Sequence, residues 1–168
     1  MDLVELQVDP TLELRMLTEP DSAVLFALVE DNRSYLKRWL PWVDDNTEEA
    51  HTLAFIESTL DEHERGEALH MGIWQEGRLC GVVGFNSLKA GHEGEIGYWL
   101  DQSLQGSGVM TKACGALVDY GFREVELRRV IILCDPKNVR SRRIAERLGF
   151  QVESANRAVR YVKEAPGG

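Results

Sequence analysis

The feature that most constrains this chain is a glycine-rich segment, Gln105-Gly106-Ser107-Gly108-Val109-Met110-Thr111. It stands between an alternating apolar segment, which predicts a strand, and an amphipathic segment, which predicts a helix from Val109. Glycines tolerate positive φ and let a ligand approach the backbone, and the first N–H groups of a helix have no intrahelical partner. The segment therefore predicts an anion site suited to a pyrophosphate, and an ordinary capped turn is the alternative interpretation.

Two nucleotide-binding motifs do not fit this segment. A dinucleotide fingerprint requires a third glycine where Thr111 stands, and it opens a βαβ unit, whereas this turn follows several predicted strands. A P-loop requires Gly-Lys-Ser/Thr after four intervening residues, which the segment lacks. Both classes of protein are therefore disfavoured.

The rest of the pattern predicts an α+β fold. Apolar alternation and apolar runs predict strands over residues 11–17, 70–74, 79–85, 93–100, 129–134, 150–153 and 159–162. A first helix is predicted after Thr18, with a buried stripe of Val24, Leu25, Leu28 and Val29. Further helices are predicted within residues 34–43, from Asn46 to Gly66, from Val109, and over residues 138–148. We expect a single domain over residues 1–168, in which an antiparallel meander precedes one strand–helix–strand crossover.

Composition narrows the class of protein further. The net charge of −9 argues against a direct nucleic-acid partner, although residues 1–65 hold 16 acidic and five basic side chains while the last quarter is basic. No segment has the length of a membrane span or the look of a signal peptide, so we expect a cytoplasmic protein without a membrane partner. The three cysteines are not paired in motifs, which favours buried structural thiols over disulfides or a metal site.

Three further segments narrow the interpretation of the glycine-rich turn. The first is Asn138-Val139-Arg140-Ser141, which is followed by Leu148-Gly149-Phe150. The second is the predicted strand Ile96-Gly97-Tyr98-Trp99-Leu100, and the third is Trp39-Leu40-Pro41-Trp42. Together they resemble the GNAT superfamily of acyl-CoA-dependent N-acyltransferases, in the subgroup that acetylates N-terminal amines of ribosomal proteins (the RimJ/RimL type). Met110 departs from the glycine or alanine usual in that turn. The resemblance implies a GNAT fold, with a mixed, mostly antiparallel sheet and helices on both faces.

The resemblance also implies where acetyl-CoA binds. The cofactor is expected between the strand that ends at Leu100 and the strand 129–134, which splay apart, with no metal involved. Main-chain groups of Trp99 and Leu100 would pair with pantetheine, and Asn138 would bond that arm or cap its helix. The pyrophosphate would lie on the turn, at Gln105, Gly106, Ser107, Gly108, Val109, Met110 and Thr111, with Lys112, Arg140 and Arg142 among the bases near the phosphates.

Two residues are expected to carry the chemistry. The subgroup resemblance implies that the Ser141 hydroxyl protonates or hydrogen-bonds the leaving thiolate, because the tyrosine that many relatives use would fall on Ala145. Glu95 is the first candidate for the base that removes the amine proton, and His70 is the second. The carboxylate that the subgroup places before its final tyrosine is replaced by Arg160.

The acceptor is the least constrained part of the prediction. Tyr35, Trp39 and Trp42 are expected to form one wall of its cleft, although each also suits simple packing. The leading acceptor is the N-terminal amine of a basic protein such as a ribosomal protein. A small cationic amine (a polyamine, an aminoglycoside-like compound or a peptide antibiotic) and a non-catalytic CoA-binding module stay open. Because the chain stops soon after residue 161, we also expect an unpaired edge there and a possible homodimer.

Overall fold

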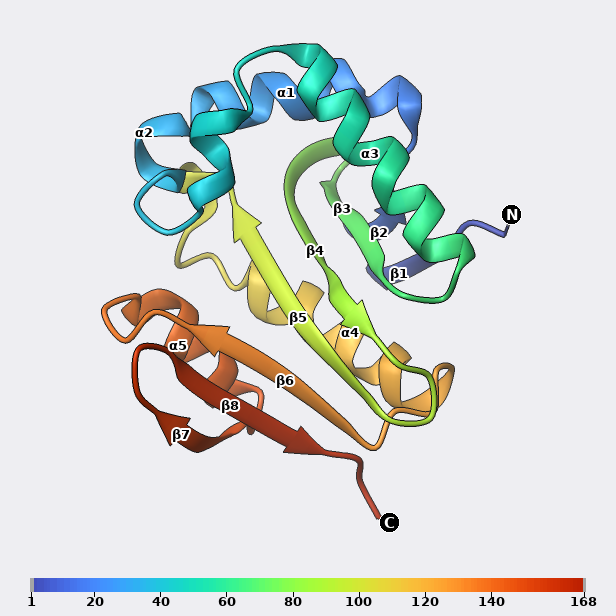
Figure 1. The fold of residues 1–168 in the computed structure, drawn as a ribbon, viewed down its shortest axis with the longest axis vertical. Helices are drawn as coiled ribbons and strands as arrows, with labels where there is room; N and C mark the ends of the chain where they lie inside the picture. Colours follow the sequence, from blue (N-terminus) through green and yellow to red (C-terminus); the bar gives the residue numbers. More distant parts are fainter. Residues whose placement is uncertain (1, 168) are drawn as a thin grey trace.

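The computed structural model describes residues 2–167 and contains one eight-stranded sheet, in the order β1-β2-β3-β4-β5-β6-β8-β7 (Figure 1). The strands are β1 (Glu5–Asp9), β2 (Leu12–Met16), β3 (Leu69–Gln75), β4 (Arg78–Leu88), β5 (Glu93–Leu100), β6 (Arg129–Cys134), β7 (Gln151–Ala155) and β8 (Val159–Glu164). Among them β5 and β6 are the one parallel pair, and α4 makes the crossover between them. The predicted α+β class, the meander and the single crossover are confirmed.

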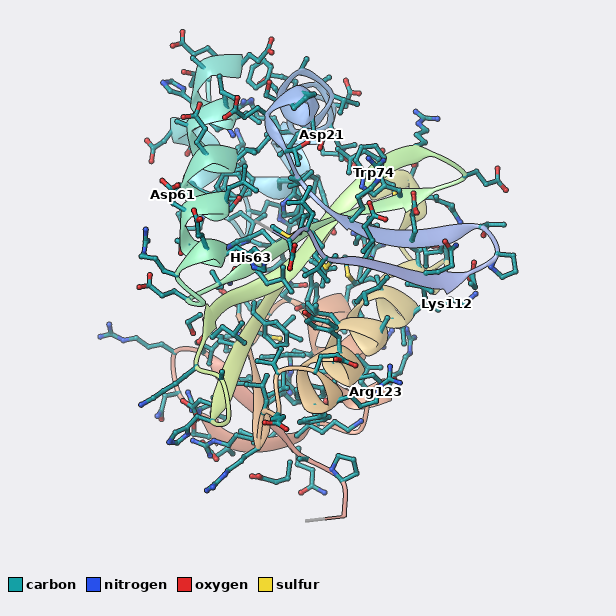
Figure 2. The ribbon with its side chains drawn as sticks, turned by 90° about the vertical axis from the view of Figure 1, so that its right-hand side faces the viewer. Asp21, Asp61, His63, Trp74, Lys112 and Arg123 are labelled. Atoms are coloured by element: carbon teal, nitrogen blue, oxygen red, sulfur yellow. The ribbon has the colours of Figure 1, made fainter. Side chains whose placement is uncertain are left out.

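The helices cover both faces of this sheet, and Figure 2 shows α3 and α4 on opposite sides of it. They are α1 (Ser22–Asp31), α2 (Arg33–Leu36), α3 (Glu49–Glu64), α4 (Val109–Arg123) and α5 (Val139–Arg147), with short 3₁₀ turns η1 (Glu19–Asp21), η2 (Pro41–Asp45) and η3 (Gln102–Leu104). Leu117 of α4 and Ala145 of α5 pack with Phe85 in the core on one face. Leu25 of α1 and Ile56 of α3 pack in the core on the other.

The parallel pair does not stay together along its whole length. β5 and β6 pair from Glu93↔Arg129 to Ile96↔Ile132 and no further, whereas β5 continues to pair with β4 as far as Leu100. β5 therefore follows the first half of the sheet and β6 follows β8, so that their carboxyl ends diverge, as the arrows in Figure 1 show. The expected splay between these two strands is confirmed.

Several local predictions need correction. The strand predicted over residues 11–17 is the second strand, because β1 precedes it and pairs with it. Val24 was placed in the buried stripe of α1 but is 45% exposed, and Ser22 is buried in its place. Asn46 does not begin α3: Glu48 is the N-cap, and the side chain of Asn46 accepts a hydrogen bond from Thr52 instead.

The end of the chain also differs from the expectation. β8, which contains Tyr161, pairs with β6 on one side and β7 on the other, so it is not an edge strand. The edge on that side is β7, whose five residues are all exposed. The three cysteines are buried and free, as predicted. Within residues 2–167, no helix is long and apolar enough to cross a membrane.

Candidate active site

The cleft of the molecule lies where β5 and β6 diverge, and it consists of two cavities. The smaller, of about 220 Å³, lies between β5, β6 and the first turns of α4 and α5. The larger, of about 580 Å³, lies between strands β3–β5 and the layer of α1, η2 and α3. Asn86, Gly97, Tyr98 and Trp99 line both cavities, so the two meet over the middle of β5.

The start of α4 presents backbone donors to solvent. Gly106 and Gly108 adopt φ of +79° and +85°, and no heavy atom lies within 4 Å of the position that a Cβ on either would take. The first backbone bond across α4 is donated by Lys112 to Gly108, so the amides of Met110 and Thr111 have no helical partner. Met110 packs in the core, and Thr111 is partly exposed. This is the geometry of an anion site at a helix N-terminus.

The neighbouring positions on the turn and on β5 shape the same cleft. Gln105 lines the smaller cavity, and its amide donates to the carbonyl oxygen of Leu100 at 3.4 Å. The side chain of Ser107 donates to the carbonyl oxygen of Leu104 and lies 3.4 Å from the amide of Val109. Residues 97–100 of β5 face the smaller cavity with an edge that β6 does not pair, which is the edge expected to receive an extended ligand.

Three polar side chains cluster at the inner end of the smaller cavity. The Ser141 hydroxyl donates to the Tyr98 hydroxyl at 3.0 Å, and that hydroxyl donates to the carbonyl oxygen of Ser141 at 2.9 Å. The sulfur of Cys134 lies 3.3 Å from the Ser141 oxygen. Burial raises the pKa of both the Tyr98 hydroxyl and the Cys134 thiol, so both groups are protonated near neutral pH. The cluster is a chain of neutral hydroxyl and thiol groups.

Asn138 takes the capping role that the sequence left open. Its side-chain oxygen accepts a hydrogen bond from the amide of Ser141 at 3.3 Å, as the N-cap of α5. The cap fixes the first turn of α5 and thereby the position of Ser141. Asn138 also lines the smaller cavity, so its amide group stands next to the space between the strands.

The three aromatic residues predicted for the acceptor wall divide between the two cavities. Tyr35 and Trp39 line the smaller one, and Trp42 lines the larger one. Trp42 is 39% exposed, and its ring centroid lies 6.3 Å from that of Trp99. Phe55 and Leu25 complete an apolar lining on the other side of the larger cavity.

The candidate bases also lie in different parts of the cleft. Glu95 lines the smaller cavity, on the same face of β5 as Gly97 and Trp99. His70 lines the larger cavity, where its ring packs edge-on against Phe55 at a centroid distance of 5.6 Å. Arg160 donates to the carboxylate of Glu153 at 2.8 Å and adds no carboxylate to the cleft.

Two bases that were expected near the phosphates are engaged elsewhere. Lys112, labelled in Figure 2, forms an ion pair with Asp9 of β1 at 3.1 Å. Arg142 donates to the Tyr161 hydroxyl and to the carbonyl oxygen of Pro136. Arg140 does line the smaller cavity.

Comparison with known proteins extends this picture. Residues 11–151 match the acetyltransferase (GNAT) domain family. The ribosomal-protein-serine acetyltransferase of Escherichia coli (strain K12) is 32% identical over 161 residues, which cover 95% of this chain and 90% of that protein.

Two solved structures are also similar. A RimL ribosomal L7/L12 α-N-protein acetyltransferase, solved in complex with coenzyme A in a disulfide with a cysteine, superposes with a TM-score of 0.92 at 29% identity; the match covers 98% of this chain and 100% of that one. The microcin C7 self-immunity acetyltransferase MccE, solved with acetyl-CoA and AMP, has a TM-score of 0.86 at 25% identity over 94% of both chains. The fold, the splayed strands and these similarities agree, and the chain belongs to the GNAT acetyltransferase family.

Proposed function

We propose that the protein transfers the acetyl group of acetyl-CoA to the N-terminal α-amine of a protein, with a basic ribosomal protein as the leading acceptor. The observation that carries this proposal is the set of free backbone amides at the start of α4, in the same cleft as Ser141. Relatives that act on ribosomal proteins support the acceptor class, because one of them matches nearly the whole chain.

Acetyl-CoA fits this cleft from one end to the other. Its pyrophosphate would accept hydrogen bonds from the amides of Met110 and Thr111, beside Gly106 and Gly108, which leave room for close approach. Its pantetheine arm would pair with the open edge of β5 at Trp99 and Leu100, next to Asn138. The thioester would then lie at the meeting of the two cavities, near Ser141 and Cys134. In a similar protein the thiol of coenzyme A reaches a cysteine, which supports this placement.

The reaction needs one proton removed and one proton supplied. The neutral amine nitrogen attacks the thioester carbonyl carbon, a C–N bond forms, and the C–S bond breaks with its electron pair on sulfur. The Ser141 hydroxyl, turned from Tyr98 toward the sulfur, donates a hydrogen bond or its proton to the thiolate and regains the proton through Tyr98 or solvent. A thiol has a pKa near ~8.5, so a weak acid is sufficient.

Direct transfer fits the cysteines better than an acetyl-cysteine intermediate. The nucleophilic form of cysteine is the thiolate. Burial raises the pKa of the Cys134 thiol, and it raises the pKa of the Cys80 thiol to about 11. The attack in a ternary complex needs no such nucleophile.

The acidity of the acceptor also favours an α-amine. At pH 7, deprotonating an α-amine costs about 1 kcal/mol, whereas deprotonating a lysine costs about 4.6 kcal/mol. The smaller cavity holds Glu95 as a half-buried carboxylate and the larger cavity holds His70, and these two residues are the candidates for the base, acting directly or through water. A modest base of this kind suits an α-amine.

A small amine is the second candidate acceptor, and one observation favours it. The cavity of about 580 Å³ on the acceptor side has the volume of a small-molecule site and is lined mainly by apolar and aromatic side chains. MccE, a similar structure, was solved with AMP as well as acetyl-CoA. A non-catalytic CoA-binding module is the third possibility, and turnover on any amine would exclude it.

The test is an acetyl-transfer assay that measures thiol release and product mass. Peptides with Ser, Ala and bulky apolar N-termini are compared with polyamines and aminoglycosides, and binding of acetyl-CoA is measured by calorimetry. We expect acetylation of α-amines and a ten- to hundredfold lower kcat for Ser141→Ala with little change in acetyl-CoA affinity. Tight binding of acetyl-CoA with no turnover on any amine would overturn the proposal.

A homodimer also stays a prediction of this proposal. The edge that it would use is β7, which ends the sheet with an exposed Val152.

A further inference from the structure

His70 stands at one end of a lane across the sheet, a row in which its two neighbours are glycines. In the register of the strands, His70 of β3 lies opposite Gly84 of β4, and Gly84 lies opposite Gly97 of β5. Residues that oppose each other in antiparallel strands point to the same face. Beyond His70, the residues of this row therefore contribute no side chain of their own, and side chains from neighbouring positions can lie over the two glycines.

Both glycines are required by what stands next to them. A Cβ on Gly84 would lie 2.4 Å from the carbonyl oxygen of Leu69 and 3.3 Å from Nδ1 of His70, so the imidazole leans over Gly84. A Cβ on Gly97 would lie 2.4 Å from the side-chain amide of Asn86. The imidazole thus lies over Gly84 and the Asn86 amide lies over Gly97, so these two polar groups follow one another along the lane to the point where β5 leaves β6.

The lane ends at the reacting centre of the proposed function. Pairing of β5 with β6 stops after Ile96, so Gly97 is the first residue at the opening of the splay. Gly97 and Tyr98 line both cavities, and the Tyr98 hydroxyl bonds Ser141. An amine in the larger cavity reaches the thioester from the side on which His70 stands.

The surroundings of His70 keep its ring neutral. Burial lowers the pKa of His70, and the opposing effect of the Glu62 carboxylate on α3 is the smaller of the two. The other charged or titratable groups that line this cavity are Asp45 of η2, His51 of α3 and Tyr98 of β5. Glu95 lies on the same face of β5 as Gly97. No hydrogen bond of the described residues occupies either ring nitrogen of His70, and its Phe55 neighbour is apolar.

Two carboxylates on β7 and α5, which line neither cavity, are engaged by other side chains. Glu153 accepts hydrogen bonds from both Arg129 and Arg160. Glu146 accepts a hydrogen bond from the Tyr161 hydroxyl. Position 160, where the subgroup resemblance implies a carboxylate, holds an arginine.

We propose that His70 is the general base that accepts the proton of the acceptor amine, at the end of the lane over Gly84 and Gly97. This inference rests on the proposed acetyl transfer. As the amine nitrogen bonds to the thioester carbon it becomes a strong acid, and its proton passes to a ring nitrogen of His70, directly or through one water. The imidazolium then returns the proton to solvent, while the thiolate takes its proton through Ser141, so the products are an amide and a thiol. Glu95, which lines the smaller cavity alone, is the competing assignment.

The test compares His70→Gln with Glu95→Gln, using a peptide α-amine that the wild-type protein acetylates. We expect His70→Gln to lower kcat/KM by roughly 10²–10⁴-fold, the range of a general base. In the pH profile of the wild-type protein, kcat/KM should rise as His70 loses its proton, around its lowered pKa, and should rise again as the acceptor amine loses its proton. The first rise should be absent in His70→Gln, and the rise that belongs to the amine should remain. Imidazole added to His70→Ala should restore part of the rate, which a merely structural role would not allow.

The control is His92→Gln, an exposed histidine in the β4–β5 turn, which should match the wild-type rate. Acetyl-CoA affinity should be equal in all variants. If His70→Gln keeps a rate within threefold of wild type with the same pH profile, or if Glu95→Gln alone loses the rate, the assignment to His70 is wrong. If the wild-type protein acetylates no amine at all, the proposed function itself fails.

Discussion

At the scale of single residues, the hydroxyl of Ser141 is held by partners that the strand and helix supply. Tyr98 accepts its hydrogen bond, Asn138 holds its amide, and the Cys134 sulfur lies next to its oxygen. A serine hydroxyl without such partners would rotate freely, and a neutral group is effective as an acid only where its hydrogen is aimed. We therefore assign Tyr98 as a positioning residue for the proposed acid.

Tyr98→Phe tests this role. The change removes one acceptor for Ser141 and one donor to its carbonyl oxygen, so we expect the free energy of unfolding to fall by about 1–2 kcal/mol. A loss of orientation worth about 1.4 kcal/mol would lower kcat roughly tenfold, with the KM for acetyl-CoA unchanged. Urea unfolding and steady-state kinetics measure both. Tyr120→Phe on α4 is the matched control, and equal kcat values for the two variants would contradict the role.

At the scale of the elements, the turn into α4 combines two glycines in the left-handed region with a helix of 15 residues. The backbone, rather than any side chain, determines where the free amides point. A side chain at Gly108 would meet no neighbour, so a substitution there changes the backbone and nothing else.

Gly108→Ala should therefore weaken cofactor binding without a steric clash. Holding a non-glycine residue at φ of +85° costs about 1–2 kcal/mol, and relaxation of that strain turns the amides away from the pyrophosphate. We expect a tenfold or greater loss of acetyl-CoA affinity in calorimetry. Gly91→Ala is the matched control, because Gly91 has φ of +72° and equally open surroundings in the β4–β5 turn. Gly91→Ala should lower the free energy of unfolding and leave the affinity for acetyl-CoA unchanged. An equal loss of acetyl-CoA affinity in Gly108→Ala and Gly91→Ala would contradict the role of the α4 amides.

At the scale of the whole molecule, two half-sheets are joined by a short parallel seam. An ionic network crosses that seam: Arg129 of β6 bonds Glu93 of β5 and Glu153 of β7, and Glu153 also bonds Arg160 of β8. The hydrogen bond from Arg129 lowers the pKa of Glu93. The groups are partly exposed, so water and salt reduce the strength of each pair.

Stability should accordingly depend on pH through Glu93. A lowered carboxyl pKa in the folded protein stabilises it above the pKa of the unfolded chain, and the effect is lost as pH falls through the folded value. Glu93→Gln should thus destabilise the protein at pH 7 and leave a smaller difference from wild type at pH 3. Urea unfolding at both pH values measures this. Glu57→Gln, an exposed glutamate of α3, should show no such pH dependence. If the free energies of unfolding of Glu93→Gln and wild type differed by the same amount at pH 7 and pH 3, the ion pair between Glu93 and Arg129 would contribute nothing to stability.

Much of this fold was predictable, because the bounds of β5 and β6 follow from apolar runs and the turn at Gly106 and Gly108 from its glycines. β1 was missed although Leu6 and Val8 alternate with polar residues, because an alternation of five residues with two apolar members is a short signal. The role of Tyr98 was missed because its partner is 43 residues away, although its place in the Ile-Gly-Tyr-Trp-Leu segment was a usable signal. The row of His70, Gly84 and Gly97 depends on strand register across three strands, which no local pattern reports.

The two halves of the cleft come from separate stretches of the chain. The smaller cavity is built largely by residues 95–144, and the larger one mostly by residues 25–86, with β5 shared between them. Under the proposed function, mutations in the earlier stretch would change which amine is admitted and would leave the residues proposed for the thioester unchanged. Such a division allows one ancestral scaffold to give rise to enzymes with unrelated targets.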